Sequence, residues 1–443
     1  MTTRETPSAG ANERKVENSY RTLWRWHFYA GLILAPMLLW AAVTGAIYIF
    51  ADEVEQVLYR SMLYVESGAS RRTLDELRDI AEAAFPEEHV SSVLVKGEED
   101  GHAVIFSMHA EGQGTRYVYL DPYTGATLGS RMRDESFFPI VRQLHRNLYL
   151  GMTGRILMEL ATSWGIILLV TGIYLWWPRR KKQGRDSGGV WWPRWRSGTR
   201  VVLRDLHAVF GMYLMPAALV ILATGLFFSQ VWGRGYLTAL VVSGNAPDAF
   251  FNPPHSKNPN SAPPLSLQQA YETAKAHDPG LSISISPPHD EEEGYGVGAG
   301  SADVPHRRSI SVLDQYSGEV LTRTDMTNAS PMLKVLSYAY PLHVGSIFGL
   351  PTKLLALMTC LVIIISTVSG VWMWWRARPR GSIGVPRRGQ DRSANRWFVL
   401  LLCGTGVLLP VAGASMVLFF AIDQLITRVP RHFRRATTKS PDR

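Results

Sequence analysis

Five long apolar stretches constrain this chain of 443 residues more than any other feature of its sequence. A helix needs about 20 apolar residues to cross a hydrocarbon core of roughly 30 Å, and each stretch reaches that length. The five stretches are Tyr29–Phe50, Ile156–Trp177, Val209–Val231, Thr352–Trp375 and Trp397–Leu425. The sequence therefore predicts an α-helical integral membrane protein whose spans are separated by polar segments.

The distribution of charged residues sets the expected orientation. Residues 178–204 carry nine Lys or Arg and one acid, and residues 376–396 carry seven and one. Basic residues collect in short cytoplasmic loops, so we expect both loops and the N-terminus in the cytoplasm. Residues 51–155 hold seventeen acids against eleven bases, which suits an external domain. The formal charge of +9 then reflects topology and attraction to the headgroups of the lipid bilayer, and we expect no nucleic-acid partner.

These features divide the chain into eleven predicted segments. In order they are a cytoplasmic N-terminus (1–25), a first span (26–50), an external domain (51–143), an outer histidine segment with a second span (144–177), a basic loop (178–204), a third span (205–231), a second external domain (232–341), an outer histidine segment with a fourth span (342–375), a basic loop (376–396), a fifth span (397–425) and a basic tail (426–443). The basic tail conflicts with an odd number of crossings. Either the charge rule fails there, or Gly404, Gly406 and Pro410 break the last stretch into a re-entrant hairpin; we favour a single crossing.

The first and third spans share one motif. Measured from His27 and from His207, a Gly follows at +4, a Pro at +9 and a Thr-Gly pair at +17 and +18. His145 and His343 precede the second and fourth spans, each with a Gly at +27 and two Trp at +31 and +32. We infer a duplicated two-helix repeat, which gives four core spans and one extra C-terminal span. The two halves are then parallel and related by an axis along the membrane normal.

Each external domain is predicted to begin with a helix and to continue as strands. Thr73 with Glu76, and Ser266 with Gln269, place a capping-box pattern at the two helix starts. The predicted strands are Val90–Val95, Ala103–Met108, Arg116–Leu120, Leu281–Ile285, Ile310–Leu313 and Val320–Arg323. In both domains an Asp-x-Tyr-Thr/Ser-Gly turn leads into the closing strand. We therefore expect two small α+β domains of similar design.

Four of the twelve histidines belong to the duplicated framework: His27, His207, His145 and His343. One interpretation is that amphipathic residues collect at membrane interfaces and were copied with the rest. The other uses depth, because His27 and His207 lie at the inner face and His145 and His343 at the outer face. Ionisable groups in membranes usually serve function, and imidazole is a common axial ligand of haem iron. We therefore predict two haem b groups, one with its iron on each histidine pair.

Four glycines accompany these histidines. Gly45, Gly172, Gly225 and Gly370 each follow a Thr or Ser near the end of one of the first four spans. Small residues also serve helix packing. At ~1.5 Å rise per residue, Gly45 lies about 27 Å beyond His27, so each face holds two histidines and two glycines. A flat macrocycle edge packs against a helix backbone only where no side chain intervenes, and we therefore predict that these glycines border the haems.

The two cysteines, Cys360 and Cys403, both lie inside predicted spans. The sequence contains no C-x-x-C-H for covalent haem and no cysteine set for an iron–sulfur cluster. Any metal centre is therefore expected to use ligands other than thiolate.

These motifs resemble the PepSY-associated transmembrane family over about residues 20–425. The resemblance rests on the His-x3-Gly…Pro…Thr-Gly spans, the Asp-x2-Thr/Ser-Gly turns and the Leu-His before the even spans. It implies two PepSY-like periplasmic domains on a multi-pass protein of the bacterial inner membrane. For the iron-uptake members it also implies a ferric-siderophore reductase with two haem groups. Gln315 replaces Pro122 of the first turn, and residues 287–304 are acidic and Gly-rich, so a recognition surface there is expected to differ from that of relatives.

The resemblance implies an outward transfer of electrons. An electron would enter at the inner haem, pass to the outer haem and reduce the Fe(III) of a periplasmic ferric siderophore, and the released Fe(II) would serve iron uptake. We assign no catalytic side chain beyond the haem ligands. Because the chain has no dinucleotide-binding fingerprint, the expected electron donor is a membrane quinol or a cytoplasmic reductase. The alternative is a non-enzymatic membrane PepSY module that binds peptides or regulates a partner protein.

Cysteine labelling tests the predicted topology. An impermeant thiol reagent added from outside should label Ser67→Cys and Ser261→Cys, because the basic loops place both external domains in the periplasm. It should not label Ser187→Cys or Ser382→Cys in those loops, and the parent chain gives the background. Labelling of Ser187→Cys from outside would reverse the topology.

Overall fold

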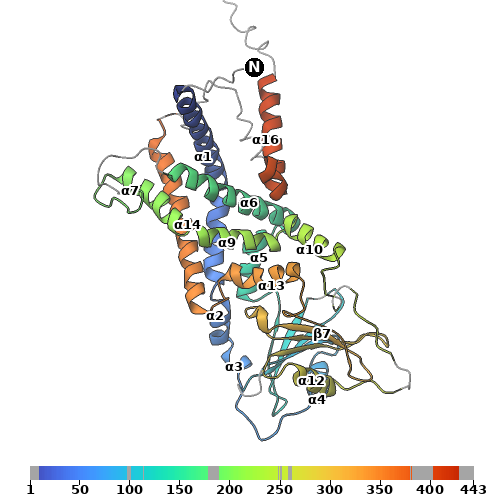
Figure 1. Cartoon of the computed structure of the whole chain (residues 1–443). Coiled ribbons are helices and arrows are strands. Elements are labelled where there is room, and N and C mark those ends of the chain that lie inside the picture. Colours follow the sequence, from blue (N-terminus) through green and yellow to red (C-terminus); the bar gives the residue numbers. More distant parts are fainter. Residues whose placement is uncertain are drawn as a thin grey trace, which may run out of the picture.

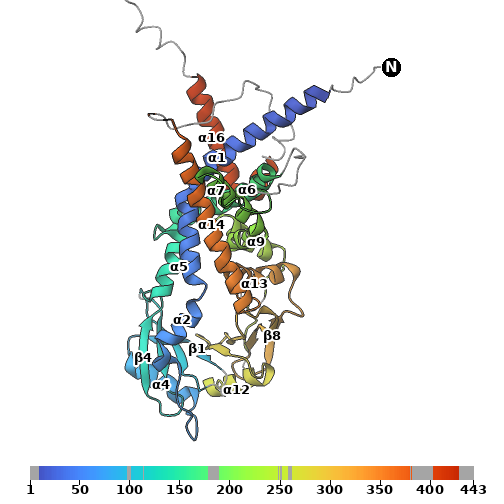
Figure 2. The same cartoon turned by 90° about the vertical axis from the view of Figure 1, so that its left-hand side faces the viewer.

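The computed structural model places a bundle of apolar helices at one end and a β-sheet at the other (Figure 1, Figure 2). We call the two ends of the bundle the sheet end and the far end, and the chain begins at the far end. The structure describes residues 9–96, 101–112, 114–177, 189–247, 249, 252–257, 262–379, 381 and 403–428, with the backbone alone at 9–19, 420 and 422–428. Much of the predicted basic loops and tail, with Ser187, Ser261 and Ser382, lies outside these residues.

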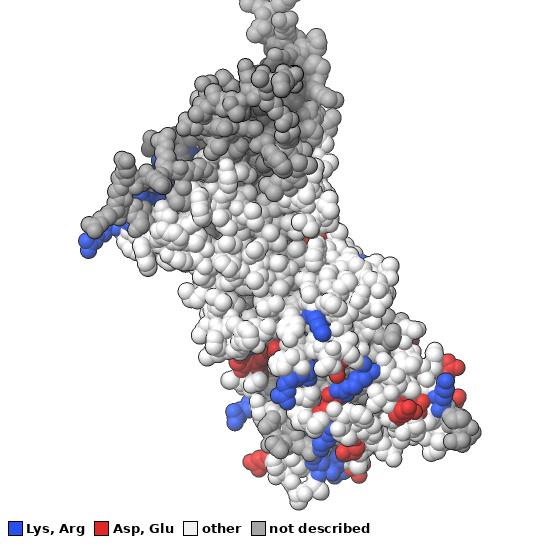
Figure 3. Space-filling view, viewed as in Figure 1, with Lys and Arg blue, Asp and Glu red and all other residues white. Residues whose placement is uncertain are grey.

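Three helices of the described chain are long and apolar enough to cross a membrane. They are α1 (Ala9–Tyr48, apolar from Tyr20), α6 (Gly151–Trp176) and α14 (Leu350–Ala377). The helices Thr199–Tyr213 and Met215–Phe228 form a fourth crossing if this pair, bent by 68°, is taken as one span. On the face in Figure 3, the band over these helices carries few charged side chains, whereas Lys, Arg, Asp and Glu gather over the sheet end. This distribution matches a membrane domain joined to a water-exposed domain.

The bend means that the third predicted span, over 205–231, is not one straight helix. Its elements are α7 (Thr199–Asp205), the π-helical turn η2 (Leu206–Phe210), α8 (Gly211–Tyr213), α9 (Met215–Gly225) and the 3-10 turn η3 (Leu226–Phe228). Pro216 lies in the first turn of α9. Proline has no N–H to continue the helical hydrogen bonds and its ring clashes with the preceding turn, so the chain changes direction there.

The fifth predicted span is wrong as a single crossing over 397–425. In its described part, residues 403–408 and α16 (Pro410–Arg428) are helical, and the chain turns back between them. A Cβ built on Gly413 would lie 2.6 Å from the Gly406 Cα, whereas seven residues of straight helix span about 10 Å. Length and hydropathy favoured a crossing, but Pro410 interrupts the helical hydrogen bonds and two glycines allow the close return.

The turn of this hairpin packs against the bundle near α6 (Figure 1). The Trp164 indole donates to Ser415 Oγ at 3.0 Å, and the Trp232 indole donates to the Leu408 carbonyl at 3.1 Å. The end of α16 therefore lies at the far end, on the same side as the start of α1 (Figure 2). This arrangement removes the conflict between the basic tail and the charge rule.

Shorter elements connect the membrane helices to the sheet. They are α2 (Ala51–Leu58), α3 (Arg60–Leu63), α5 (Phe137–Asn147), α10 (Trp232–Val242), η4 (Pro305–Arg307) and α13 (Pro331–Val344). Of these, α5 directly precedes α6, and α13 directly precedes α14. Both lie at the sheet end of the bundle (Figure 1).

The sheet has eight antiparallel strands in the order β4-β3-β2-β1-β5-β6-β7-β8. The strands are β1 (His89–Val95), β2 (Val104–His109), β3 (Arg116–Leu120), β4 (Thr127–Met132), β5 (Ile283–Ser286), β6 (Tyr295–Ala299), β7 (Ser309–Leu313) and β8 (Val320–Asp325). β1 pairs with β5 in a symmetric register, Val93 opposite Ile285 and Val95 opposite Ile283. The two small domains predicted from sequence therefore share one continuous sheet, and β6 was not predicted.

Two helices, α4 (Leu74–Ala84) and α12 (Leu267–His277), cover one face of this sheet and share a single apolar core with it. Both begin with the predicted capping box. Each also caps the other. The Asp75 carboxylate accepts the N–H groups of Leu267 and Gln268 at 3.0 and 3.1 Å, and the Gln268 side chain accepts the N–H of Leu74 at 2.9 Å. The two helix starts thus lock the two halves together.

Gln315, at the position equivalent to Pro122 of the first turn, is buried and its side chain is hydrogen-bonded to the backbone. Its side-chain amide donates to the Asp290 and Glu293 carbonyls at 2.9 and 2.7 Å. Gln315 therefore holds the acidic segment between β5 and β6 in place. Pro122, at the equivalent position of the first half, has no side-chain donor that could do this.

Replacing Asp75 with Ala should loosen the start of α12. The variant loses both charge-assisted bonds to the α12 N–H groups, a loss of about 1 kcal/mol. Hydrogen exchange of the full-length protein in detergent should show roughly five-fold faster exchange in peptides covering residues 262–270. Asp79→Ala, an exposed carboxylate on α4, is the control and should leave exchange unchanged. Equal exchange in both variants would contradict reciprocal capping.

Candidate functional site

Two pairs of histidines meet inside the membrane bundle. His27 of α1 and His207 of η2 lie at the far end, with ring centroids 6.2 Å apart and planes inclined by 88°. His145 of α5 and His343 of α13 lie at the sheet end, with centroids 6.1 Å apart and planes inclined by 57°. These are the pairs that the depth argument predicted.

In the first half, a threonine hydroxyl on a neighbouring helix anchors each imidazole. His27 Nδ1 lies 2.9 Å from Thr171 Oγ1, and His145 Nδ1 lies 2.9 Å from Thr44 Oγ1. Each hydroxyl donates its only proton to the carbonyl four residues earlier in its own helix, at 2.8 and 2.7 Å. The hydroxyl must therefore accept from the imidazole, which places the ring proton on Nδ1.

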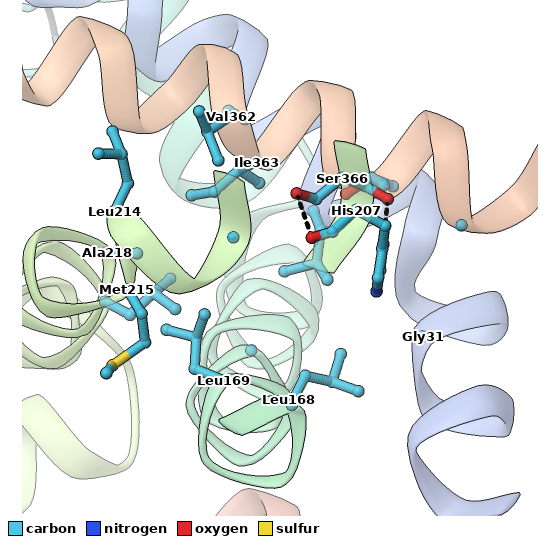
Figure 4. Close-up of a pocket in the computed structure, with 18 of the residues that line it drawn as sticks. Gly31, Leu168, Leu169, His207, Leu214, Met215, Ala218, Val362, Ile363 and Ser366 are labelled. Carbon is cyan, nitrogen blue, oxygen red and sulfur yellow. Dashed lines mark hydrogen bonds between the residues drawn. The ribbon is translucent and has the colours of Figure 1, made fainter. Parts of the chain in front are cut away.

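In the second half, backbone carbonyls take the same role. His207 Nδ1 donates to the Ser366 carbonyl at 2.7 Å, a bond drawn in Figure 4, and His343 Nδ1 donates to the Ile221 carbonyl at 2.9 Å. A carbonyl only accepts, so these rings also carry their proton on Nδ1. All four imidazoles therefore keep the Nε2 lone pair available, which is the tautomer that binds a metal.

These anchors were not predicted from the sequence. A Thr or Ser precedes each of the four glycines, but only the glycine was assigned a role. Thr44 and Thr171 are the hydroxyls that accept from His145 and His27. The Ile221 and Ser366 carbonyls lie three residues before the corresponding Thr224 and Ser369. The repeated hydroxyl was the signal that could have found them.

Each of the four glycines lies against one imidazole. A Cβ built on Gly225 would lie 3.0 Å from His343 Cε1, and one on Gly45 would lie 3.3 Å from His145 Cε1. The corresponding distances are 3.5 Å from Gly172 to His27 and 3.2 Å from Gly370 to His207. The expectation assigned these glycines to a macrocycle edge, whereas the contact among protein atoms is with the imidazoles. A Cβ at Gly45, Gly225 or Gly370 would crowd the ring, whereas 3.5 Å at Gly172 is ordinary van der Waals contact.

All four histidines and all four glycines line one cavity of about 1680 Å³ that runs through the bundle. Pockets for a single small ligand usually have roughly 300–1000 Å³, so this one has room for more than one. Its middle is apolar, and Figure 4 shows Leu168, Leu169, Met215 and Ile363 around the same space.

The two ends of the cavity are polar. Arg142, Arg146 and Arg155 line the sheet end with Tyr48 and Tyr340, and tryptophans with arginines line the far end. Burial raises the pKa of Tyr340, so its hydroxyl stays protonated as a hydrogen-bonding group.

The residues present fit a flat macrocycle with a metal at its centre. With about 2 Å for each metal–imidazole bond and about 1 Å from nitrogen to ring centre, two axial imidazoles place their centroids about 6 Å apart. Both observed pairs have this separation. Within the described residues, no three His, Cys, Asp or Glu side chains are grouped to hold a bare metal ion. The cysteines are a buried Cys360 and an exposed Cys403, and neither forms a disulfide.

The remaining histidines of the described residues lie outside this cavity. Three of them gather on the sheet, where His89 lies opposite His109 on the neighbouring strand and near His289. Their ring centroids are 5.9 and 6.5 Å apart, and all three side chains are exposed. His432 lies outside the described residues.

Comparison with known proteins gives one family. The family model described as the PepSY-associated TM region matches residues 24–377, which include all four histidines and the whole sheet. No curated protein matches the chain.

Replacing Gly225 with Ala tests the fit between glycine and imidazole. The new Cβ would lie 3.0 Å from His343 Cε1, and a shift of the ring would disturb its hydrogen bond to the Ile221 carbonyl. We expect a loss of about 1–3 kcal/mol, measured as a lower thermal unfolding midpoint in detergent.

Gly235→Ala on α10 is the matched control, since nothing lies within 4 Å of a Cβ built there. It should leave the midpoint unchanged or raise it, because Ala favours a helix by roughly 0.5–1 kcal/mol over Gly. Equal midpoints for the two variants would show that Gly225 is not needed to seat the ring.

Proposed function

The chain belongs to the PepSY-associated transmembrane family, and on that premise we propose that it is a dihaem electron-transfer protein that reduces ferric siderophores. The observation that carries the proposal is the pairing of four part-buried imidazoles at the two ends of one cavity. Each ring has its Nδ1 hydrogen-bonded to the protein and its Nε2 free. Histidines with a structural role alone could make the same Nδ1 hydrogen bonds. Nothing in that role would require the rings to meet in pairs.

Two haem b groups suit these ligands. His27 and His207 would hold the iron of one, and His145 with His343 the iron of the other. When bound, haem supplies reversible one-electron chemistry. The Nδ1 hydrogen bonds orient each imidazole and make it a stronger ligand, as outer partners of metal-bound histidines generally do.

The apolar middle of the cavity has a complementary role. Its leucine, isoleucine and methionine side chains exclude water between the two pairs, and a dry, rigid surrounding limits the reorganisation that accompanies a change of charge. The bundle thereby separates the two sides of a membrane while keeping the two ligand pairs in one enclosure.

We place the far end in the cytoplasm and the sheet in the periplasm of a bacterial inner membrane. The charge of the loops supports this orientation. So does the return of α16 to the far end, because basic residues follow α16 in the sequence. In this orientation each half of the chain has the same order of parts. A membrane helix is followed by one helix and four strands of the sheet, then by an outer histidine and a second membrane helix.

The substrate on the sheet side would be a ferric siderophore. One electron converts its Fe(III) to Fe(II), and no other bond of the chelate needs to change. Fe(II) is a softer ion than Fe(III) and a poorer match for the hard oxygen ligands of a siderophore, so reduction weakens the chelate. The released Fe(II) then becomes available for uptake.

The electron donor would reach the far end. The sequence has no dinucleotide-binding fingerprint, so the donor is a membrane quinol or a cytoplasmic reductase. Trp176, Trp191 and Trp374 line the cavity there together with Arg200 and Arg378. This aromatic and basic rim is suited to a planar or anionic donor.

The optical spectrum and haem content of the purified protein test the proposal. Wild-type protein should show low-spin b-type haem at close to two per chain. His207→Ala should halve the haem and keep the sheet-end group, and His343→Ala should keep only the far-end group and lose ferric-chelate reduction. His306→Ala, an exposed histidine on η4, should retain both.

The double variant His27→Ala/His207→Ala tests whether these two share one iron. It should lose no more haem than either single variant. Twice the loss would place the two histidines on different irons, and colourless wild-type protein from haem-replete cells would replace the reductase with a non-enzymatic module.

A further inference from the structure

Three arginines gather at the sheet end of the cavity, next to His145 and His343. Arg142 and Arg146 lie one turn apart on α5, and Arg155 lies in the second turn of α6. The Arg146 guanidinium is within electrostatic reach of both Arg142 and Arg155. Three like charges at the rim of an apolar cavity repel one another, so an anion bound among them would stabilise their arrangement.

The connection between α5 and α6 forces this gathering. Leu148, Tyr149 and Gly151 have φ values of 55°, 56° and 55°. Positive φ is unfavourable for Leu148 and Tyr149, because both carry a Cβ. A Cβ built on Gly154 would lie 1.7 Å from the Asn147 carbonyl oxygen, so α6 begins in direct contact with the end of α5. Strained backbone of this kind is retained where the surrounding structure needs the geometry.

The protein neutralises these three charges only in part. Arg142 reaches Asp134 only at 3.4 Å on the surface, and Arg155 donates one nitrogen to the Phe228 carbonyl at 3.2 Å. Arg155 Nε is buried without a hydrogen-bond partner. Within the part of the chain that the structure describes, Arg146 has no hydrogen bond or ion pair.

The nearest buried carboxylate is already in use. Glu159, one turn beyond Arg155, accepts the N–H groups of Val231 and Trp232 at 2.7 and 2.9 Å, one on each oxygen. It lowers the repulsion felt by Arg155 but has no oxygen directed to the other two arginines. Among the described residues, no carboxylate is therefore paired with Arg146 or with the buried Arg155 Nε.

The second half of the chain provides an internal comparison. The arginines stand at −3, +1 and +10 relative to His145, and the same positions relative to His343 hold Tyr340, Val344 and Lys353. The Lys353 ammonium is paired with Glu53 at 2.7 Å. At these three positions, the arginines that lack a close ion pair therefore belong to the His145 half and not to the His343 half.

We propose that Arg142, Arg146 and Arg155 bind the two carboxylates of the porphyrin held by His145 and His343. A haem carries both carboxylates on one edge, and a charge cluster on one side of its ligands would fix which way that edge points. Guanidinium groups bind carboxylates through paired, charge-assisted hydrogen bonds. The site rests on the proposed function and adds the orientation of one of its two haems.

The rate of haem loss from the holoprotein to a haem-free globin tests this assignment. Arg146→Gln and Arg155→Gln should each speed loss of the sheet-end haem roughly ten-fold, the effect of one charge-assisted hydrogen bond. The far-end haem should leave at the wild-type rate, which also reports that the variant is folded. Arg234→Gln, a cation near Arg155 that does not line the cavity, is the control and should change neither rate.

Haem dimethyl ester, whose carboxylates are blocked, identifies the bound group. Wild-type protein should lose the ester from the sheet-end site faster than Arg146→Gln loses haem, because the ester blocks both carboxylates. The triple variant Arg142→Gln/Arg146→Gln/Arg155→Gln should not distinguish haem from its ester. Arg146→Lys, which keeps the charge without the paired donors, should fall between wild type and Arg146→Gln.

Two outcomes would overturn the assignment. If the arginine variants lose haem at the rate of Arg234→Gln, the cluster does not bind porphyrin carboxylates. If they instead raise only the KM for ferric citrate and not for a neutral ferric hydroxamate, the cluster binds the carboxylates of the substrate. Both outcomes leave two haems in wild-type protein, whereas wild-type protein without haem would refute the proposed function itself.

Discussion

An N–H group inside a hydrocarbon slab must find an acceptor within the protein, and this requirement organises the membrane bundle. Each of the four framework histidines satisfies it with an atom of another helix. His27 of α1 reaches α6, His145 of α5 reaches α1, His207 reaches α14 and His343 of α13 reaches α9. The same bonds that tie the helices together leave one nitrogen of every ring facing the cavity. Cohesion of the bundle and the chemistry of its centre therefore depend on one set of contacts.

Much of the membrane domain could be predicted because its signals are local or repeated. Span length, motif spacing and helical rise were enough to place His27 beside His207 and to bring two glycines to the same end as each histidine pair. The contact of each glycine with an imidazole was not predicted. The shape of the third span was not predictable in this way. Pro36 and Pro216 occupy the same motif position, yet α1 continues through Pro36 and the third span bends by 68° at Pro216. Neighbouring helices decide how each proline is accommodated, and a single sequence does not contain that information.

Prediction of the sheet and its two covering helices from the sequence was limited in a similar way. Capping boxes and alternating apolar residues predicted both helices and most strands. β6 was missed because Gly296 and Gly298 occupy positions in it, and glycine is unfavourable in strands. The joining of the two half-sheets was missed because β1 and β5 are far apart in sequence and carry no pairing signal. The hairpin at Pro410 was judged by apolar length, which is the same for a crossing and for a fold-back.

The β1–β5 pairing also has a consequence for how the protein is made. Val93 and Ile285 pair across the sheet, so β1 emerges from the ribosome long before its partner. Until β5 is in place, β1 is an open strand edge of the kind that recruits other chains. Contacts between residues so distant in sequence also form slowly. Correct biogenesis therefore depends on guarding one unpaired edge during synthesis, and pairing of β1 with β5 joins the two halves of the chain that also line the membrane cavity.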